Sequence, residues 1–280
     1  MTDERDEAIR ERMRRDWRAR YRHYAERAAP KNRPFAELLV AAVRPAPGER
    51  VLDVATGPGV VALAAARAVG PTGSVVATDL VPEWGEVVAE ESAREGLANV
   101  AFETMGAEEL ALPDASFDVA LCQFGLMFVP DPVRALREMR RVLRPGGRLG
   151  VAVWSTPEKV AHFLVTRIVL AAAPPPPAAE RGPSPLDLGE PGLIERLVGE
   201  AGFGEIAVGR ETREHVVADP EEEWRQRLEE PASVPARALA GLPEGERRRL
   251  HDAAIAALEG YRRDGAIRLP SEAVLVTAVR

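Results

Sequence analysis

The strongest constraint on the fold is a regular alternation of short apolar runs and helical stretches between Arg50 and Trp154. The apolar runs have the length of strands and read VLDVA, SVVATDL, VAFETM, FDVALCQF and RLGVAVW. The stretches between them that favour helices read GVVALAAARAV, EWGEVVAEESARE and PVRALREMRRVL. Strands and helices that alternate in this way form right-handed βαβ units. The segment therefore predicts a parallel sheet.

Helices are expected before this segment, and a mixture of helices and strands after it. Residues 4–28 carry apolar side chains at spacings of three and four, typical of an amphipathic helix: Ile9, Met13, Trp17, Tyr21, Tyr24 and Ala28. A second helix is expected to follow Pro34 and to end before Pro45. The remaining predicted helices cover 157–173, 191–202 and most of 219–264, with breaks at Pro231, Pro235 and Pro243. An extended loop is predicted for the run Pro174 to Pro177 and the following ERGPSP, and strands are predicted over 204–217 and 273–280.

Composition excludes several classes of protein. The single cysteine, Cys122, lies in an apolar run, which indicates a buried thiol in a reducing compartment. The first residues are charged and no run of about 18 apolar residues occurs, so neither secretion nor a membrane span is expected. The chain has 37 Lys and Arg against 44 Asp and Glu, and its net charge of −7 would repel a nucleic-acid backbone. We expect a cytoplasmic protein without nucleic-acid or membrane partners.

A glycine-containing turn and a distant acid predict a ligand site. The sequence VLDVATGPGVVALAA places Asp53, Gly57 and Gly59 at the junction of the first predicted strand and its helix. Glycines at such a turn let a ligand approach the backbone, and the helix N-terminus offers free N–H groups. Asp79 ends the second predicted strand, where its carboxylate can accept two hydrogen bonds from a ribose diol.

These residues leave two cofactor classes open. Gly57, Gly59 and Ala62 fit the G-x-G-x-x-A fingerprint of dinucleotide-binding proteins, which would make the chain an NAD(P)-dependent oxidoreductase. Asp53 argues against this reading, because its carboxylate would repel a pyrophosphate and attract a ligand that carries an ammonium and a sulfonium. A tight turn without any ligand is the structural alternative.

The stretch from Arg50 to Trp154 resembles the class I S-adenosylmethionine (SAM)-dependent methyltransferases. Within that class it is most similar to the group of the ubiquinone and menaquinone C-methyltransferases and many small-molecule O- and N-methyltransferases. The matching motifs, in order, are VLDVATGPG, ATDLVPEW, MGAEELALPDASFDVALCQFGLMFV and LREMRRVLRPGGRLGVAVW. The resemblance implies an α/β, Rossmann-like fold with a seven-stranded, mostly parallel sheet, an antiparallel last strand, N-terminal helices and a helical cap.

The resemblance also implies how the chain would hold SAM. Asp53, Ala55 and Gly57 would surround the methionine end, Gly59 would keep the loop close, and Thr56 of the same loop is a further cofactor-binding candidate. The residues implied beside the methionine chain and the sulfonium are Gln123 and Phe128.

The second and third motifs imply which residues would bind the adenosine end of SAM. Asp79 would hold the ribose hydroxyls, and Leu80 and Trp84 would face the adenine. The family usually places an Asp followed by a small residue at the adenine, whereas this chain has Gly106 and Ala107 there. The nearest acid that would compensate is Glu108.

Methyl transfer from SAM requires no metal and no covalent intermediate, so the protein aligns the reactants and, for a hydroxyl or carbon nucleophile, removes a proton. His162 follows the fifth predicted strand and has an ordinary pKa of about 6.5, which suits a base at neutral pH. Tyr21 and Tyr24 are further candidates on the first helix, which is expected either to cover the pocket or to pack on the core. A neutral amine would need no base. Surface or capping roles are expected for the other histidines: His23, His215 and His251.

Four parts are predicted along the chain: an N-terminal helical lid at 1–45, a SAM-binding core at 46–156, a helical cap with the sixth strand at 157–264, and the last strand at 265–280. The predicted function is methyl transfer from SAM to an O, N or C atom of a small-molecule metabolite, with S-adenosylhomocysteine (SAH) as product. The alternatives are an NAD(P)-dependent oxidoreductase and a non-catalytic SAM-binding protein. A monomer or homodimer is expected.

Overall fold

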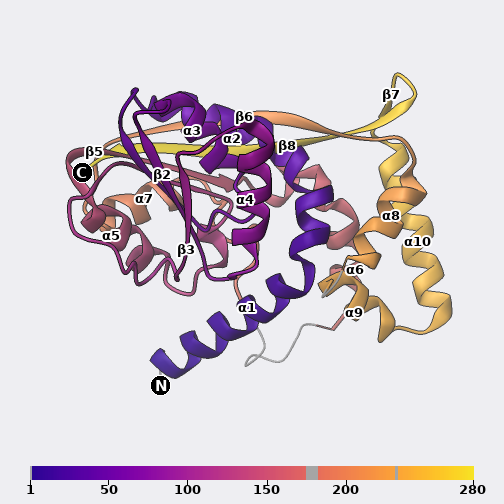
Figure 1. The fold of residues 1–280 in the computed structure, drawn as a ribbon. Coiled ribbons are helices and arrows are strands. Elements are labelled where there is room, and N and C mark those ends of the chain that lie inside the picture. The colour runs from indigo at the N-terminus through magenta and orange to yellow at the C-terminus, as the bar shows by residue number, and fades with distance from the viewer. Residues whose placement is uncertain (1, 175–181, 231–232) are drawn as a thin grey trace. The chain divides into compact units, whose positions relative to one another are not determined.

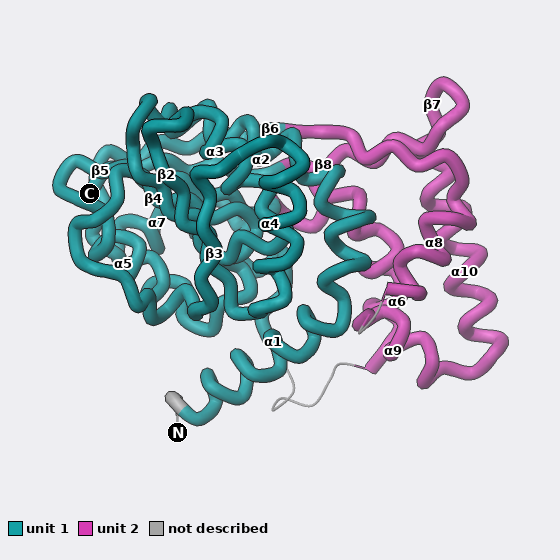
Figure 2. The backbone as a smooth tube through the Cα atoms, in the orientation of Figure 1, with its two compact units in different colours: residues 1–154, 182–211, 273–280 teal, residues 155–181, 212–272 magenta. Residues whose placement is uncertain are grey.

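The structure is a computed structural model that describes residues 2–174, 182–230 and 233–280 (Figure 1). The chain forms two compact units (Figure 2). The first contains residues 1–154, 182–211 and 273–280, and the second contains residues 155–181 and 212–272. Residues 175–181 of the predicted extended loop lie outside the described residues, as does the predicted break at Pro231.

Five parallel strands form the centre of the sheet, as the alternating pattern predicted. β1 (Arg50–Val54) pairs with β2 (Ser74–Asp79) on one side and with β4 (Phe117–Gln123) on the other. β3 (Val100–Thr104) pairs with β2, and β5 (Leu143–Trp154) pairs with β4. Six of the seven residues of β4 are buried, which explains why central parallel strands are continuous apolar runs in the sequence.

The antiparallel last strand is also confirmed. β8 (Ala266–Val279) runs antiparallel to β5, with Arg148 opposite Val279 and Trp154 opposite Ala273. β6 (Gly204–Val217) completes the order β3-β2-β1-β4-β5-β8-β6, which contains the seven strands expected. An additional two-residue strand, β7 (Arg262–Arg263), pairs with β8 and has no counterpart among the predicted elements.

The helices of the first unit are α1 (Thr2–Arg27), α2 (Ala29–Val43), α3 (Val60–Val69), α4 (Trp84–Glu95), the short η1 (Leu126–Phe128), α5 (Pro132–Val142) and α7 (Leu193–Glu200). The start of α5 illustrates how sequence sets these boundaries. Asp131 caps the helix by accepting a hydrogen bond from the main-chain N–H of Arg134 at 2.9 Å, and Pro132 occupies the first turn.

The predicted start of the second helix is wrong. α2 begins at Ala29, and Pro34 lies inside it. A proline in a helix removes one main-chain hydrogen bond, but Ala29, Asn32 and Phe35 are buried along one face. Packing of this face therefore keeps the turn before Pro34 helical.

The second unit contains η2 (Pro157–Lys159), η3 (Ala161–Phe163), α6 (Leu164–Ala172), α8 (Pro220–Glu229), α9 (Val234–Ala240) and α10 (Glu244–Glu259). Its buried apolar cluster includes Val165, Val217 and Leu258. Pro235 does not break a helix as predicted, because it occupies the first turn of α9, where its missing N–H is not needed. Among the residues described, no helix has both the length and the apolar character needed to cross a membrane.

Candidate active site

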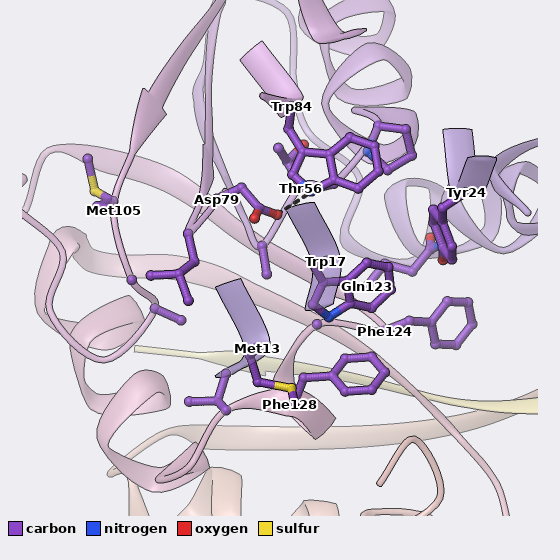
Figure 3. A pocket seen from close by; sticks show the side chains of 18 of the residues that line it. Met13, Trp17, Tyr24, Thr56, Asp79, Trp84, Met105, Gln123, Phe124 and Phe128 are labelled. Atoms are coloured by element: carbon purple, nitrogen blue, oxygen red, sulfur yellow. Dashed lines mark hydrogen bonds between the residues drawn. The ribbon is translucent and has the colours of Figure 1, made fainter. Parts of the chain in front are cut away.

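A cavity in the first unit lies where the carboxyl ends of several parallel strands meet (Figure 3). Its walls come from α1, from the first turns of α2, and from the segments that follow β1, β2, β3 and β4. The space that no atom fills, including the open mouth, is about 970 Å³. The carboxyl ends of parallel strands are where open α/β sheets bind ligands, so this cavity is the candidate active site.

Asp79 connects two of the cavity's segments. Its Oδ2 accepts a hydrogen bond from the main-chain N–H of Gly57 at 2.9 Å, and its Oδ1 accepts one from the N–H of Val81 at 3.0 Å. Each carboxylate oxygen has a second lone pair, so the group retains the capacity to accept hydrogen bonds from a ligand. Asp79 is partly exposed and lines the cavity.

The two glycines of the loop serve different purposes. Gly57 has a φ of 52°, lines the cavity, and has open space where a side chain would project. Gly59 has a φ of 82°, and a Cβ on it would come within 3.0 Å of the Val88 side chain on α4. Gly57 therefore leaves room for a ligand, whereas Gly59 allows the loop to pack against a neighbouring helix.

Asp53 lies beneath the loop instead of in the cavity wall. Its side chain is 1% exposed, and its Oδ2 accepts a hydrogen bond from Thr56 Oγ1 at 2.6 Å. Burial raises the pKa of Asp53 to about 7, and the nearby Asp79 carboxylate adds to the increase. Burial also raises the pKa of Asp79 to about 6, against the opposing effect of its main-chain hydrogen bonds. Both carboxylates thus change charge near neutral pH.

The part of the cavity that follows β3 contains the predicted Gly106, Ala107 and Glu108. Glu108 is 5% exposed, and its Oε2 is 3.1 Å from Arg10 Nη1 of α1. Its Oε1 accepts a hydrogen bond from the main-chain N–H of Asp131 at 3.0 Å. Glu108 therefore connects α1 with the start of α5, and this role does not depend on a bound ligand.

Aromatic rings form one wall of the cavity. Trp17 of α1 packs edge to face against Tyr24 and Phe128, with ring centroids 5.1 and 5.4 Å apart. Trp84 of α4 lines the same cavity at 1% exposure, and its ring packs against Tyr21 at 5.8 Å. The aromatic stripe of the first helix thus both packs on the core and faces the cavity. Tyr24 lines the cavity, whereas Tyr21 packs against the buried cluster of Val81, Trp84 and Val87.

Polar groups from three elements meet beside these rings. Gln123, the last residue of β4, donates from Nε2 to the main-chain carbonyl of Asn32 at 3.1 Å. The side chain of Asn32 donates in turn to the Tyr24 hydroxyl oxygen at 2.8 Å. All three residues line the cavity. Figure 3 shows Tyr24 and Gln123 in its wall.

His162 belongs to the second unit, whereas the lining residues of the cavity all belong to the first. The imidazole is 6% exposed, and its Nδ1 lies 2.7 Å from the Ser271 hydroxyl. Its ring stacks on that of His215 with centroids 5.1 Å apart. The surface role expected for His215 is therefore wrong, because this side chain is only 7% exposed. His215 lies on β6 at the edge of the sheet, and it is buried by contact with distant residues such as His162.

Most of the predicted cofactor residues are brought together: Ala55, Thr56, Gly57, Asp79, Leu80, Trp84, Gly106, Ala107, Glu108, Gln123 and Phe128 all line the cavity. Sequence reasoning missed Arg10, Asn32 and Gly125, which line it as well. A Cβ on Gly125 would come within 2.5 Å of the Ala55 Cβ, so this glycine permits close packing of two cavity segments. No motif identifies Arg10 or Asn32, since both reach the cavity only through helix packing.

Residues 51–147 match the protein family described as a methyltransferase domain. This stretch of the chain is a methyltransferase domain. The match agrees with the resemblance of its motifs to class I SAM-dependent enzymes. The matched residues include the cavity segments that follow β1, β2, β3 and β4.

Relatives of the methyltransferase domain carry names that differ in the atom methylated. Nocamycin O-methyltransferase of Saccharothrix syringae is 33% identical over 186 residues, which are 62% of this chain and 66% of that protein. The ubiquinone/menaquinone biosynthesis C-methyltransferase UbiE of Ectopseudomonas mendocina is 46% identical over 112 residues, 40% of this chain and 44% of that protein. Protein Rv1405c of Mycobacterium tuberculosis is 35% identical over 181 residues, 65% of this chain and 63% of that protein. The chain thus spans less than two thirds of the length of each of these relatives.

The fold has relatives among solved structures. The crystal structure of the YcgJ protein of Bacillus subtilis aligns with a TM-score of 0.56 at 19% identity. The alignment covers 88% of this chain and 97% of that one. The likeness establishes a shared fold that extends beyond the methyltransferase domain.

Proposed function

We propose that this chain transfers a methyl group from SAM to an O, N or C atom of a small molecule. The observation that carries the proposal is the position of Asp79, whose carboxylate lines the cavity while hydrogen-bonded to the N–H of Gly57. A ribose acceptor and a glycine loop that approach each other at the carboxyl ends of β1 and β2 suit the adenosyl group of SAM.

The residues present fit this cofactor. Gly57 has open space where a Cβ would project, and a Cβ on Gly106 would meet only Leu80 Cδ1, at 3.9 Å. Both positions therefore leave the main chain accessible to a ligand in the cavity. Asp79 is the ribose acceptor, with Leu80 and Trp84 beside the adenine.

The methionine end is assigned to the segments that follow β1 and β4. Ala55, Thr56 and Gly57 hold this end, and Gln123 and Phe128 lie beside the sulfonium. Asp53 supports the loop from below through its hydrogen bond with Thr56. Its carboxylate contributes negative charge beneath a cationic ligand once it is ionised.

The bound cofactor supplies an activated methyl group, which leaves the chain to orient the acceptor, exclude water and remove a proton where the acceptor requires it. The rings of Trp17 and Phe128 supply an apolar wall that excludes water. The proposed proton acceptors are His162, Tyr21 and Tyr24. The helices of residues 1–45 are assigned as a lid. Residues 157–264 are assigned as the part of the chain that selects the substrate.

Calorimetric titration with SAH and with NAD tests the proposal. SAH should bind and NAD should not, and binding of NAD alone would favour the oxidoreductase reading. A methylation screen against a panel of small metabolites then identifies the acceptor. Binding of SAH without methylation of any acceptor would favour a non-catalytic SAM-binding protein.

A further inference from the structure

We propose that Gln123 accepts a hydrogen bond from the nucleophilic group of the methyl acceptor, so that methylation takes place on a hydroxyl or an amine and not on carbon. This inference rests on the proposed function, because it assumes that SAM binds in the cavity. It narrows the methylated atom from O, N or C to O or N.

The carbonyl oxygen of the Gln123 side chain is the basis of the proposal. Oε1 is buried and has no hydrogen-bond partner among the described residues, although Gln123 lines the cavity. A buried acceptor without a donor is costly, and most such atoms in proteins are paired. A ligand in the cavity is the group placed to supply the missing donor.

The orientation of the amide follows from its other contact. Nε2 lies 3.1 Å from the main-chain carbonyl oxygen of Asn32, and a carbonyl oxygen can only accept. The NH₂ group must therefore face Asn32, which leaves Oε1 as the free group. The side chain of Asn32 is itself fixed by its hydrogen bond to Tyr24. Residues of α1, α2 and β4 thus form one hydrogen-bonded chain that orients the Gln123 amide.

We assign the nucleophile as the donor because of the position of Gln123 in the sheet. β2 and β4 pair with opposite edges of β1, so Asp79 and Gln123 lie on opposite sides of the β1 end. A ligand whose ribose binds Asp79 extends across that end toward Gln123. The methyl group to be transferred is then on the Gln123 side, where the acceptor has to approach.

The residues around Gln123 indicate the chemical character of the rest of the methyl acceptor. Trp17, Tyr24, Phe124 and Phe128 line the cavity together with Gln123 (Figure 3). An apolar, flat group that carries a hydroxyl or amine suits such a wall. The neutral amide orients the X–H bond without taking its proton. As the nucleophile's lone pair forms the bond to the methyl carbon, the electron pair of the carbon–sulfur bond stays on sulfur. The proton of the X–H group passes to one of the proton acceptors proposed above.

Binding of three small probes tests the inference without relying on activity. Phenol, aniline and toluene have the same ring and differ in the OH, NH₂ or CH₃ group, and their binding to the SAH complex can be compared by ligand-observed NMR. Phenol and aniline should bind the parent roughly tenfold more tightly than toluene, as expected for one hydrogen bond to an otherwise unpaired acceptor. Gln123→Leu should remove this preference, and Gln123→Met serves as a second variant if the first is unstable.

Gln226→Leu is the matched control, because Gln226 lies on α8 and donates to Glu222. It should retain the preference of the parent for phenol and aniline over toluene. Equal binding of the three probes to the parent would overturn the inference while leaving the proposed function intact. Weakened SAH binding in the Gln123 variants with an unchanged probe preference would also overturn it, since the amide would then serve the cofactor. Failure of the parent to bind SAH would instead reject the proposed function.

Discussion

The main-chain N–H of Gly57 donates to Oδ2 of Asp79 at 2.9 Å, which fastens the loop after β1 to the end of β2. The two residues are 22 positions apart, and both line the cavity. One carboxylate therefore shapes the glycine loop and remains available to a ligand.

Replacement of Asp79 should weaken cofactor binding. Asp79→Ala removes a charged acceptor for two ribose hydroxyls, at a cost of roughly 3–5 kcal/mol before compensation. Calorimetry should show a loss of SAH affinity of two orders of magnitude or more. Asp114→Ala is the control, because Asp114 is 75% exposed and pairs with Arg141 on the surface. Unchanged affinity in Asp79→Ala would refute the ribose assignment.

Cofactor binding should release protons near pH 6. The pKa of Asp79 is raised to about 6, so in the absence of a ligand a large fraction is protonated at that pH. Ribose hydroxyls donate to the ionised form, which favours loss of the proton on binding. Affinity for SAH should thus rise from pH 5 to pH 8. Titrations in buffers of different ionisation enthalpy measure the released protons, and a pH-independent affinity would contradict the assignment.

Asp53 should make the free protein less stable as pH rises. Its folded-state pKa is about 7 and its ordinary value is 3.8, so the folded state binds the proton more tightly than the unfolded state does. The resulting stabilisation is complete below about pH 4 and is lost as pH rises through 7. Asp53→Asn keeps an oxygen for Thr56 and does not titrate. The melting temperature of the parent should therefore fall more between pH 5 and pH 8 than that of the variant, and parallel curves would contradict the shifted pKa.

The fluorescence of Trp84 should respond to the cofactor. Its ring lines the cavity and is assigned to the adenine. Trp84→Phe should lose most of the quenching that SAH causes in the parent. Trp17→Phe is the appropriate comparison, because Trp17 lines the same cavity from α1. If Trp84→Phe is quenched as strongly as the parent, the adenine does not lie beside Trp84.

Loss of Arg10 should loosen α1. Arg10→Ala leaves the buried Glu108 carboxylate without its cationic partner, which should cost about 1–3 kcal/mol of unfolding free energy. Arg14→Ala removes an exposed pair with Glu11 and should cost less than about 1 kcal/mol. Hydrogen exchange should be faster in α1 for the first variant only. Equal exchange in both would show that Glu108 does not hold the helix.

The role of His162 depends on the acceptor. With a hydroxyl substrate, His162→Ala should lower kcat by roughly 10²-fold if the imidazole takes the proton. His251→Ala is the control, because His251 lies on α10 and contacts Glu221 and Asp252 at the surface. A near-normal kcat with only a raised KM would reject the base role.

The sequence by itself determined the order of the strands and helices and the glycine loop. Alternation of strand-length and helical runs between Arg50 and Trp154 specified the parallel sheet, because each run has to bury its own apolar residues against its neighbours. Gly57 and Asp79 were identifiable because Gly57 lies in the turn after the first predicted strand and Asp79 ends the second. The start of α2 was not, since local signals at Pro34 were outweighed by burial of the preceding turn.

Only the tertiary structure decided which distant side chains meet. Arg10 and Glu108 are 98 positions apart, Asn32 and Gln123 are 91 apart, and His162 and Ser271 are 109 apart. Periodicity tells which face of a helix is apolar, but not the rotation and position at which that helix packs, and these determine whether one polar group reaches another. The hydrogen bonds of Gln123 and Glu108 therefore depend on packing that no local pattern encodes.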